Sequence, residues 1–218
     1  MSRRWLWVAV GVVVVIALAA LAWFTPLLSV RTVEVRGLAS VPEDQVLAAL
    51  DLPQGQPLLQ VDTGAAAQRV AQIPKVAQAR VQREYPSTVR VTVDEREPAV
   101  FYDSPQGTHL MDSGAVDFAI EPPPPGVPRL TVSSPGPDDP VTLAALDVLS
   151  TIPPGLRTQV SDVAARSISD IRLTLLDKRV IVWGSADNAD RKAAIALPLL
   201  TQPGQTYDIS SPDLPTVK

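Results

Sequence analysis

Hydrophobic positions follow three different patterns along the 218-residue chain, and each pattern predicts a different kind of structure. Residues 5–24 carry no charge, residues 32–95 show alternating and helical periodicities, and residues 99–211 form short apolar runs separated by prolines. An uncharged run of about twenty residues can cross a hydrocarbon core of roughly 30 Å at 1.5 Å per residue. We therefore expect a transmembrane helix over residues 5–27, followed by two folded regions.

The residues that flank the apolar run predict its orientation. Arg3 and Arg4 precede it, and a positively charged flank stays on the cytoplasmic side of a membrane. A cleaved secretory signal or a twin-arginine signal is the alternative, but its apolar stretch is normally only about 7 to 15 residues. The length favours an uncleaved single-pass type II anchor, with a cytoplasmic tail over residues 1–4 and the bulk of the chain outside. Tryptophans near both ends of the run suit the membrane interface: Trp5, Trp7 and Trp23.

Residues 28–98 predict a small domain with the element order strand, helix, helix, strand, strand. The first strand closes at Gly37, and the first helix follows a capping box formed by Ser40 and Glu43. Asp62 or Thr63 caps the second helix, and two strands meet around residues 85–87. Two helices on one face of a three-stranded sheet would bury a shared apolar set: Val33, Val35, Val46, Leu47, Leu50, Val70, Ile73, Val89, Val91 and Val93.

The last strand of this domain runs into the charged sequence "DEREP", which Pro98 closes. Glu95 and Glu97 share one strand face, as a pair of catalytic carboxylates does. A solvated charge run at the point where the strand leaves the sheet is the interpretation that we favour. The segment then marks the end of the strand and no reaction centre.

Residues 99–211 predict a mixed, β-rich domain with flanking helices. "SPQG" joins two short strands, and "EPPPPGVP" is an extended connector. Asp139 and Pro140 begin a helix, and Asp177 and Lys178 form the tip of a hairpin. A further helix is capped by Asp187 or Asn188, "QTYDISS" is the last strand, and residues 212–218 are a proline-broken tail. The whole chain is thus an α+β protein behind a transmembrane helix.

Composition and charge exclude several classes of function. The chain has no cysteine, and its single histidine, His109, has Asp112 and Ser113 nearby without the spacing of a catalytic triad. Nucleotide-binding loops, zinc-protease motifs and the serine motifs of cell-wall enzymes are missing from the sequence. The formal net charge is −4, and neither folded region has the basic excess that nucleic acid requires. We expect no catalytic activity, no cofactor or metal, and neither nucleic acid nor a small-molecule substrate as ligand.

Several motifs give the chain a family likeness. "VRTVEVRG", "IPKVAQARVQREYPSTVRVTVDEREPAV", "LMDSGAV", "VPRL", "RVIVWGSADNADRKAAIALPLL" and "YDISSPDLPTV" follow the apolar run. Together they resemble the bacterial cell division family FtsQ, called DivIB in some lineages, over nearly the whole chain. The bias toward alanine, proline and valine is typical of a high-GC actinobacterium. The resemblance implies a POTRA domain over residues 28–98, closed by Glu95, Arg96 and Pro98, and an FtsQ-type β domain over residues 99–211.

The resemblance also implies a function. It predicts a non-enzymatic divisome scaffold that binds FtsB and FtsL and connects early and late division proteins to septal peptidoglycan synthesis. The partner would dock on the last strand by strand addition, at Thr206, Tyr207, Asp208, Ile209, Ser210 and Ser211. The side chains of Tyr207 and Ile209 either face that partner or fill the core. Two functional alternatives stay open: an exported POTRA-like chaperone or translocation module, and a cell-wall enzyme.

Overall fold

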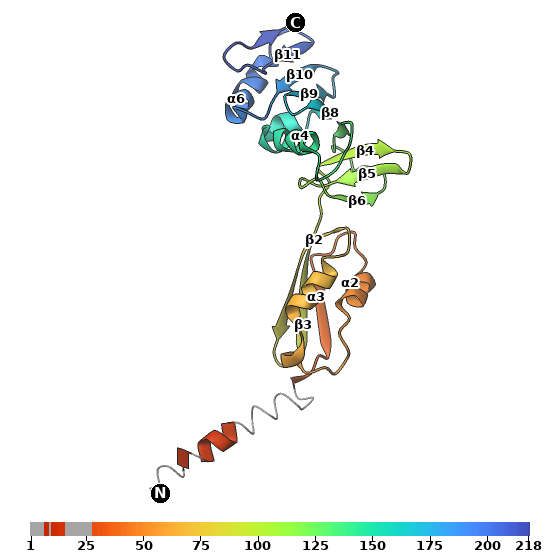
Figure 1. Cartoon of the computed structure of the whole chain (residues 1–218), viewed down its shortest axis with the longest axis vertical. Coiled ribbons are helices and arrows are strands. Elements are labelled where there is room, and N and C mark those ends of the chain that lie inside the picture. Colours follow the sequence, from red (N-terminus) through yellow and green to blue (C-terminus); the bar gives the residue numbers. More distant parts are fainter. Residues whose placement is uncertain (1–6, 9, 16–27) are drawn as a thin grey trace. The chain divides into compact units, whose positions relative to one another are not determined.

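The computed structural model describes residues 7–8, 10–15 and 28–218. The chain divides into two compact units, Met1–Arg96 and Glu97–Lys218 (Figure 1). The predicted tail over residues 1–4 and most of the predicted transmembrane helix over residues 5–27 lie outside the described residues. Within the described part of the chain, no helix is both long enough and apolar enough to span a membrane.

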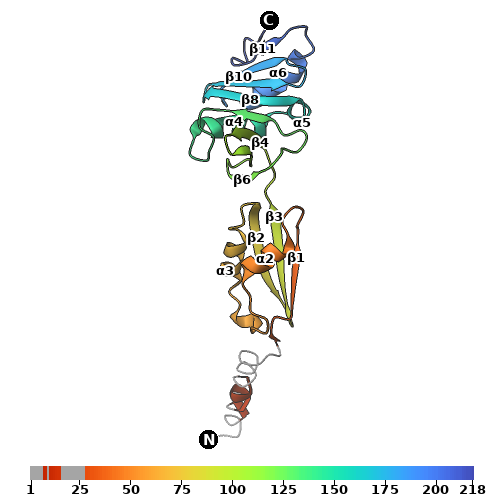
Figure 2. The same cartoon turned by 90° about the vertical axis from the view of Figure 1, so that its right-hand side faces the viewer.

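The first unit has the predicted order of elements. The strands are β1 (Thr32–Arg36), β2 (Val76–Glu84) and β3 (Thr88–Glu95), and the helices are α2 (Glu43–Leu50), the 3-10 turn η2 (Leu58–Gln60) and α3 (Thr63–Val70). Within residues 28–96 the sheet has the order β1-β3-β2. The first pair is parallel and the second is antiparallel (Figure 2). β3, the unit's last strand in sequence, therefore lies in the centre of the sheet between β1 and β2.

One hydrophobic core holds the first unit together. Val46 and Leu50 of α2 and Val70 of α3 pack with the three valines of β3, all at most 1% exposed. Leu47, predicted to be buried, is 41% exposed. The prediction was wrong because adjacent helical residues are about 100° apart, so only the positions four apart, 46 and 50, share the inward face.

The loop between β1 and α2 also differs from the prediction. Helix α2 begins after Pro42 without a side-chain cap, so the expected capping box does not form. Ser40 is engaged with the end of β3 instead. Gly37, at the end of β1, has φ +87°, and a Cβ there would lie 2.1 Å from the carbonyl oxygen of Val93. Glycine is therefore required where this loop crosses β3.

The second unit contains nine strands and three helices within residues 97–218. The strands are β4 (Val100–Ser104), β5 (Gly107–Met111), β6 (Asp117–Ile120), β7 (Arg129–Thr131), β8 (Val160–Ser167), β9 (Asp170–Leu175), β10 (Val180–Gly184), β11 (Thr206–Asp208) and β12 (Thr216–Val217). The helices are α4 (Pro140–Thr151), α5 (Pro154–Arg157) and α6 (Ala189–Leu199). All nine strands join one sheet in the order β12-β11-β10-β9-β8-β7-β4-β5-β6.

The pairing in this sheet is uneven. β4 and β5 form a hairpin with five registered residue pairs, from Val100–Met111 to Ser104–Gly107. β4 meets β7 at a single pair, Phe101–Arg129, with the Phe101 amide 3.0 Å from the carbonyl oxygen of Pro128. Val100 nevertheless shares one core with Leu130 of β7. The contact between the β4–β6 strands and the rest of the sheet therefore depends mainly on side chains.

The ends of the helices test the predicted caps. Asp139 caps α4 by accepting bonds from the amides of Val141 and Thr142, and Asp62 caps α3 through the amide of Ala65. The cap predicted for α6 is absent, because Asn188 has left-handed backbone angles and its side chain makes no cap bond. Asp187 accepts a bond from the hydroxyl of Ser185 instead, 2.8 Å away.

Candidate docking edge and domain junction

The predicted docking strand is shorter and more deeply buried than its sequence indicated. β11 covers only Thr206–Asp208, and the exposed fractions of Tyr207 and Ile209 are 1% and 0%. Both side chains belong to the core of the second unit. Of the two roles left open for them, the structure assigns core packing.

Tyr207 holds its surroundings through its ring and its hydroxyl. The hydroxyl lies 2.7 Å from the carbonyl oxygen of Gln202 and 2.9 Å from that of Gly204. The guanidinium of Arg179 lies 5.6 Å from the ring centroid and donates to the carbonyl oxygen of Leu200 at 2.7 Å. Tyr207 therefore joins the loop before β11 to the end of α6.

The outer edge of β11 is already paired, which corrects the prediction that this edge is open. The expected tail over residues 212–218 contains β12, which pairs antiparallel with β11. Thr206 and Lys218 exchange both backbone bonds, each with a donor–acceptor distance of 2.9 Å. The prediction missed β12 because a two-residue strand next to prolines has no periodicity to detect.

The residues after β11 continue along β10 and tie the tail to the unit. The amide of Ile209 donates to the carbonyl oxygen of Val182 at 3.0 Å. Ser210 donates its amide and its hydroxyl to the carboxylate of Asp208, at 3.0 and 2.7 Å. Ser211 is exposed, and beyond it Asp213 forms an ion pair with Arg191 of α6. The predicted docking residues thus build a sheet edge, but β12 is its outermost strand.

The opposite end of the same sheet is β6, next to a cluster that the sequence did not reveal. His109 of β5 has its Nδ1 2.5 Å from a carboxylate oxygen of Asp117, and Tyr102 of β4 donates its hydroxyl to that oxygen at 2.8 Å. The two rings stack with centroids 4.9 Å apart. Burial, followed by the bond to Asp117 and its charge, raises the pKa of Tyr102 to about 12.

As the sequence indicated, His109 belongs to no triad with Asp112 and Ser113; its partner is Asp117. Asp112 and Ser113 are close in sequence, whereas Asp117 is placed by the register of three strands, which pairs His109 with Tyr102 and with Ile120. The lengths of the β4–β5 and β5–β6 hairpins set this register, so they are the sequence signal that could have identified Asp117 as the partner of His109. The cluster is a hydrogen-bonded group on a sheet face, without a nucleophile.

The junction residues bind back to the first unit. Glu95, at the end of β3, accepts bonds from the hydroxyl of Ser40 at 2.5 Å and from the amides of Ala39, Ser40 and Val41 at 2.7 to 3.0 Å. Partial burial raises the pKa of Glu95, but the bonds from Ser40 and from the three amides outweigh it and lower the pKa to about 2. Glu95 is thus an anchored carboxylate, and the prediction that it belongs to a solvated charge run was wrong.

Arg96 fastens the same strand end on its other side. Its amide donates to the carbonyl oxygen of Lys75 at 2.8 Å, and its Nε donates to that of Pro74 at 3.1 Å. Glu95 and Arg96 therefore bind the loops before α2 and before β2, while Pro98 belongs to the second unit. The division between the units falls between Arg96 and Glu97.

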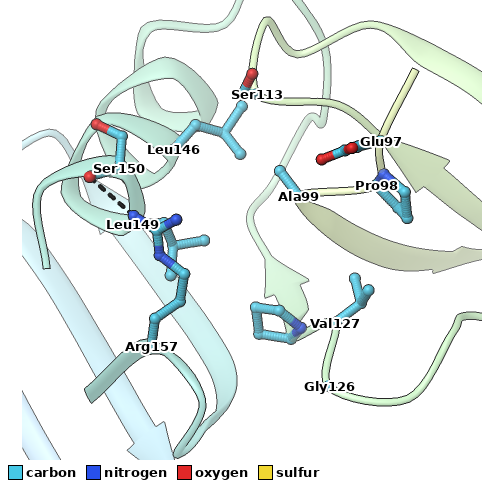
Figure 3. A pocket seen from close by; sticks show the side chains of 11 residues that line it. Glu97, Pro98, Ala99, Ser113, Gly126, Val127, Leu146, Leu149, Ser150 and Arg157 are labelled. Atoms are coloured by element: carbon cyan, nitrogen blue, oxygen red, sulfur yellow. Dashed lines mark hydrogen bonds between the residues drawn. The ribbon is translucent and has the colours of Figure 1, made fainter. Parts of the chain in front are cut away.

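A shallow cavity of about 410 Å³ lies within the second unit. Its apolar lining includes Pro98, Ala99 and Leu146, and Arg157 donates to the carbonyl oxygen of Ser150 at 2.8 Å on one wall (Figure 3). Arg157 is thus already used within the protein. In the part of the chain that the structure describes, no three His, Asp or Glu side chains come together in a way that could hold a metal ion.

Comparison of the chain with known proteins identifies a family. Residues 28–96 match the POTRA domain, FtsQ-type. The chain is 54% identical over 213 residues to the cell division protein FtsQ of Mycolicibacterium smegmatis and 55% identical over 205 residues to that of Mycobacteroides abscessus. These matches cover 98% and 94% of this chain but only 64% and 66% of the two relatives, so the chain spans just under two thirds of their length.

The cell division protein FtsQ of Corynebacterium glutamicum is 34% identical over 222 residues, and there the match covers the whole of both chains. The similarity therefore extends beyond the POTRA unit to the nine-stranded sheet and its edge. The chain belongs to the FtsQ family of bacterial cell division proteins.

Proposed function

We propose that this chain is a non-enzymatic scaffold of the bacterial division machinery. It is anchored by residues 5–27 in the cell membrane, with its folded units outside the cytoplasm at the septum. It links early and late division proteins by binding FtsB and FtsL, and it thereby supports septal peptidoglycan synthesis. Family membership and the uncharged run over residues 5–24 support this role.

The docking site that we propose is the sheet edge built by Thr206–Ser211 and β12. An edge strand presents unpaired N–H and C=O groups to which an extended partner segment can add as a further strand. Because Thr206 and Lys218 exchange both of their bonds, the next pair, Tyr207 and Val217, is a non-hydrogen-bonded pair. The N–H and C=O groups of Val217 consequently face outward. This outward N–H is the observation that carries the proposal.

The experiment removes that donor without removing the strand. Val217→Pro deletes the outward N–H, and proline is tolerated at an edge position whose N–H faces away from the sheet. Val217→Ala is the matched control, because it shortens the same side chain and keeps the N–H. Affinity of the full chain in detergent for the extracytoplasmic segments of FtsB and FtsL should fall at least about tenfold for the proline variant, which is about 1.4 kcal/mol. The alanine variant should bind nearly as the parent does.

A shorter truncation distinguishes two forms of the same idea. Removal of residues 212–218 leaves Tyr207 and Ile209 in the core, whereas removal from Thr206 onward would delete both buried side chains and unfold the unit. Loss of binding in the shorter truncation supports docking on β12. Tighter binding would mean that the partner pairs with β11 and competes with β12. Unchanged binding in all variants would overturn the proposed edge.

A further inference from the structure

Three segments meet at the end of the first unit where the chain enters it. The amide of Val30 donates to the carbonyl oxygen of Gln56 at 2.9 Å, and the amide of Gly55 donates to that of Val30 at 3.1 Å. The amide of Arg31 donates to the carbonyl oxygen of Ser87 at 2.9 Å. Residues 29–32, 53–57 and 85–87 therefore form one surface, the N-terminal face, at the end of the unit where β1 starts (Figure 2).

The N-terminal face carries the only aromatic side chain of residues 28–96. Tyr85 lies at the turn between β2 and β3, followed by Pro86, and it is 59% exposed. The core of this unit is built from aliphatic side chains alone. Tyr85 therefore presents an amphipathic ring, apolar in its body and polar at its hydroxyl, on the outside of a unit whose core is aliphatic.

The length of the chain limits how far this face can be from a membrane. Phe24 is the last residue of the uncharged run, and Ser29 is already paired with Pro57 in the first unit. Five residues span at most about 18 Å when fully extended, at up to 3.6 Å each. If residues 5–24 cross the bilayer, the N-terminal face must therefore lie within about 18 Å of the end of that run.

We propose that the N-terminal face rests on the lipid headgroup layer, with Tyr85 inserted as an interfacial anchor. Tyrosine suits this position because its ring is apolar and its hydroxyl stays hydrated, which is why tyrosines gather at membrane–water interfaces. Arg31 is the one charged residue among residues 29–32, 53–57 and 85–87, so charge contributes little to the contact. Next to the face, Glu84 forms an ion pair with Arg90, and Arg83 donates to the carbonyl oxygen of Val61 at 2.7 Å. The contact is therefore expected with zwitterionic lipids and should depend little on salt. The inference depends on the membrane anchor proposed above.

The absence of cysteine from the sequence permits a clean test, because one introduced cysteine takes one spin label. Gln54→Cys places the label on the N-terminal face and keeps Tyr85. Ala77→Cys is the matched control, an exposed position about eight residues from Tyr85 along β2, or roughly 26 Å at 3.3 Å per residue. The full chain is reconstituted into phosphatidylcholine nanodiscs that contain a nickel-chelating lipid, and the relaxation of each label by the nickel headgroups is measured.

The label at residue 54 should relax several-fold more strongly than the label at residue 77. Tyr85→Ser in the Gln54→Cys background should reduce that relaxation, and Tyr85→Trp should restore it. Equal relaxation of the two labels, or no effect of Tyr85→Ser, would overturn the inference while the anchor stands. Extraction of the chain from the nanodiscs by alkaline carbonate would instead refute the anchor itself, and with it this inference.

Discussion

Replacement of Glu95 by glutamine tests how strongly the loop before α2 is held at the end of β3. The fall in pKa from its ordinary value of 4.5 to about 2 corresponds to at most about 3.4 kcal/mol, at 1.36 kcal/mol per pH unit. The carboxylate is still partly in contact with water, so this figure must be discounted. We expect Glu95→Gln to lower the free energy of unfolding of the first unit by about 1–2 kcal/mol at pH 7.

The stability that Glu95 contributes also depends on pH. Because the folded-state pKa is depressed, the stabilisation is fully present above pH 4.5 and is lost as the pH falls toward 2. The difference between the parent and the Glu95→Gln variant should therefore shrink across this range. Urea unfolding of the full chain in detergent micelles, followed by the amide NMR signals of β1 and β3, reads the first unit separately from the second.

Glu97→Gln is the control for this experiment. Glu97 is the next acidic residue, it is exposed, and it lies outside the loop that Glu95 binds. Its replacement should change the stability of the first unit by less than about 0.5 kcal/mol. The stabilising role of the Glu95 carboxylate would be refuted if Glu95→Gln cost no more than this control at pH 7, or if its cost were the same at pH 7 and pH 2.

Three further changes have expected outcomes. Gly37→Ala should destabilise the first unit by at least about 2 kcal/mol more than Gly55→Ala, since both have positive φ but only the first Cβ meets backbone; the same urea titration would contradict this if the two costs were equal. Tyr207→Phe should lower the free energy of unfolding of the second unit by about 1–3 kcal/mol, because two carbonyl groups lose their hydrogen-bond donor. The indole NMR signal of Trp183 follows this unfolding, and an unchanged urea midpoint would contradict the prediction. Asp117→Asn should lower the pKa of Tyr102 from about 12 without returning it to 10, because burial stays; a ring-carbon NMR titration checks this.

The sequence was sufficient where structure is local. Caps such as Asp139, the turn at Asp177 and Lys178, and the order of elements in the first unit follow from patterns within a few residues. Where a residue's partner is distant, prediction failed. Ser40 has the spacing of a capping box, yet it bonds to Glu95, which is 55 positions away along the chain. No pattern within a short window can distinguish these two bonds.

The candidate docking edge shows the same limit. The sequence located the strand around Tyr207 correctly, but whether its outer edge is free depends on residues 216–218, which fold back against it. The pairing of His109 with Asp117 likewise depends on the register of three strands. Edges and registers are set by the whole sheet, so they become visible only when the sheet is assembled.

The single residue pair between β4 and β7 has a consequence for how the second unit opens. The strand pairings on both sides of this β4–β7 contact are longer, with five residue pairs between β4 and β5 and three between β7 and β8. Local unfolding proceeds in cooperative blocks that separate where few bonds cross. Amide hydrogen exchange should therefore divide the unit into a β4–β6 block and a β7–β12 block. A force that pulls Glu97 and β12 apart would act across the β4–β7 contact, which should therefore be the first contact in the sheet to break.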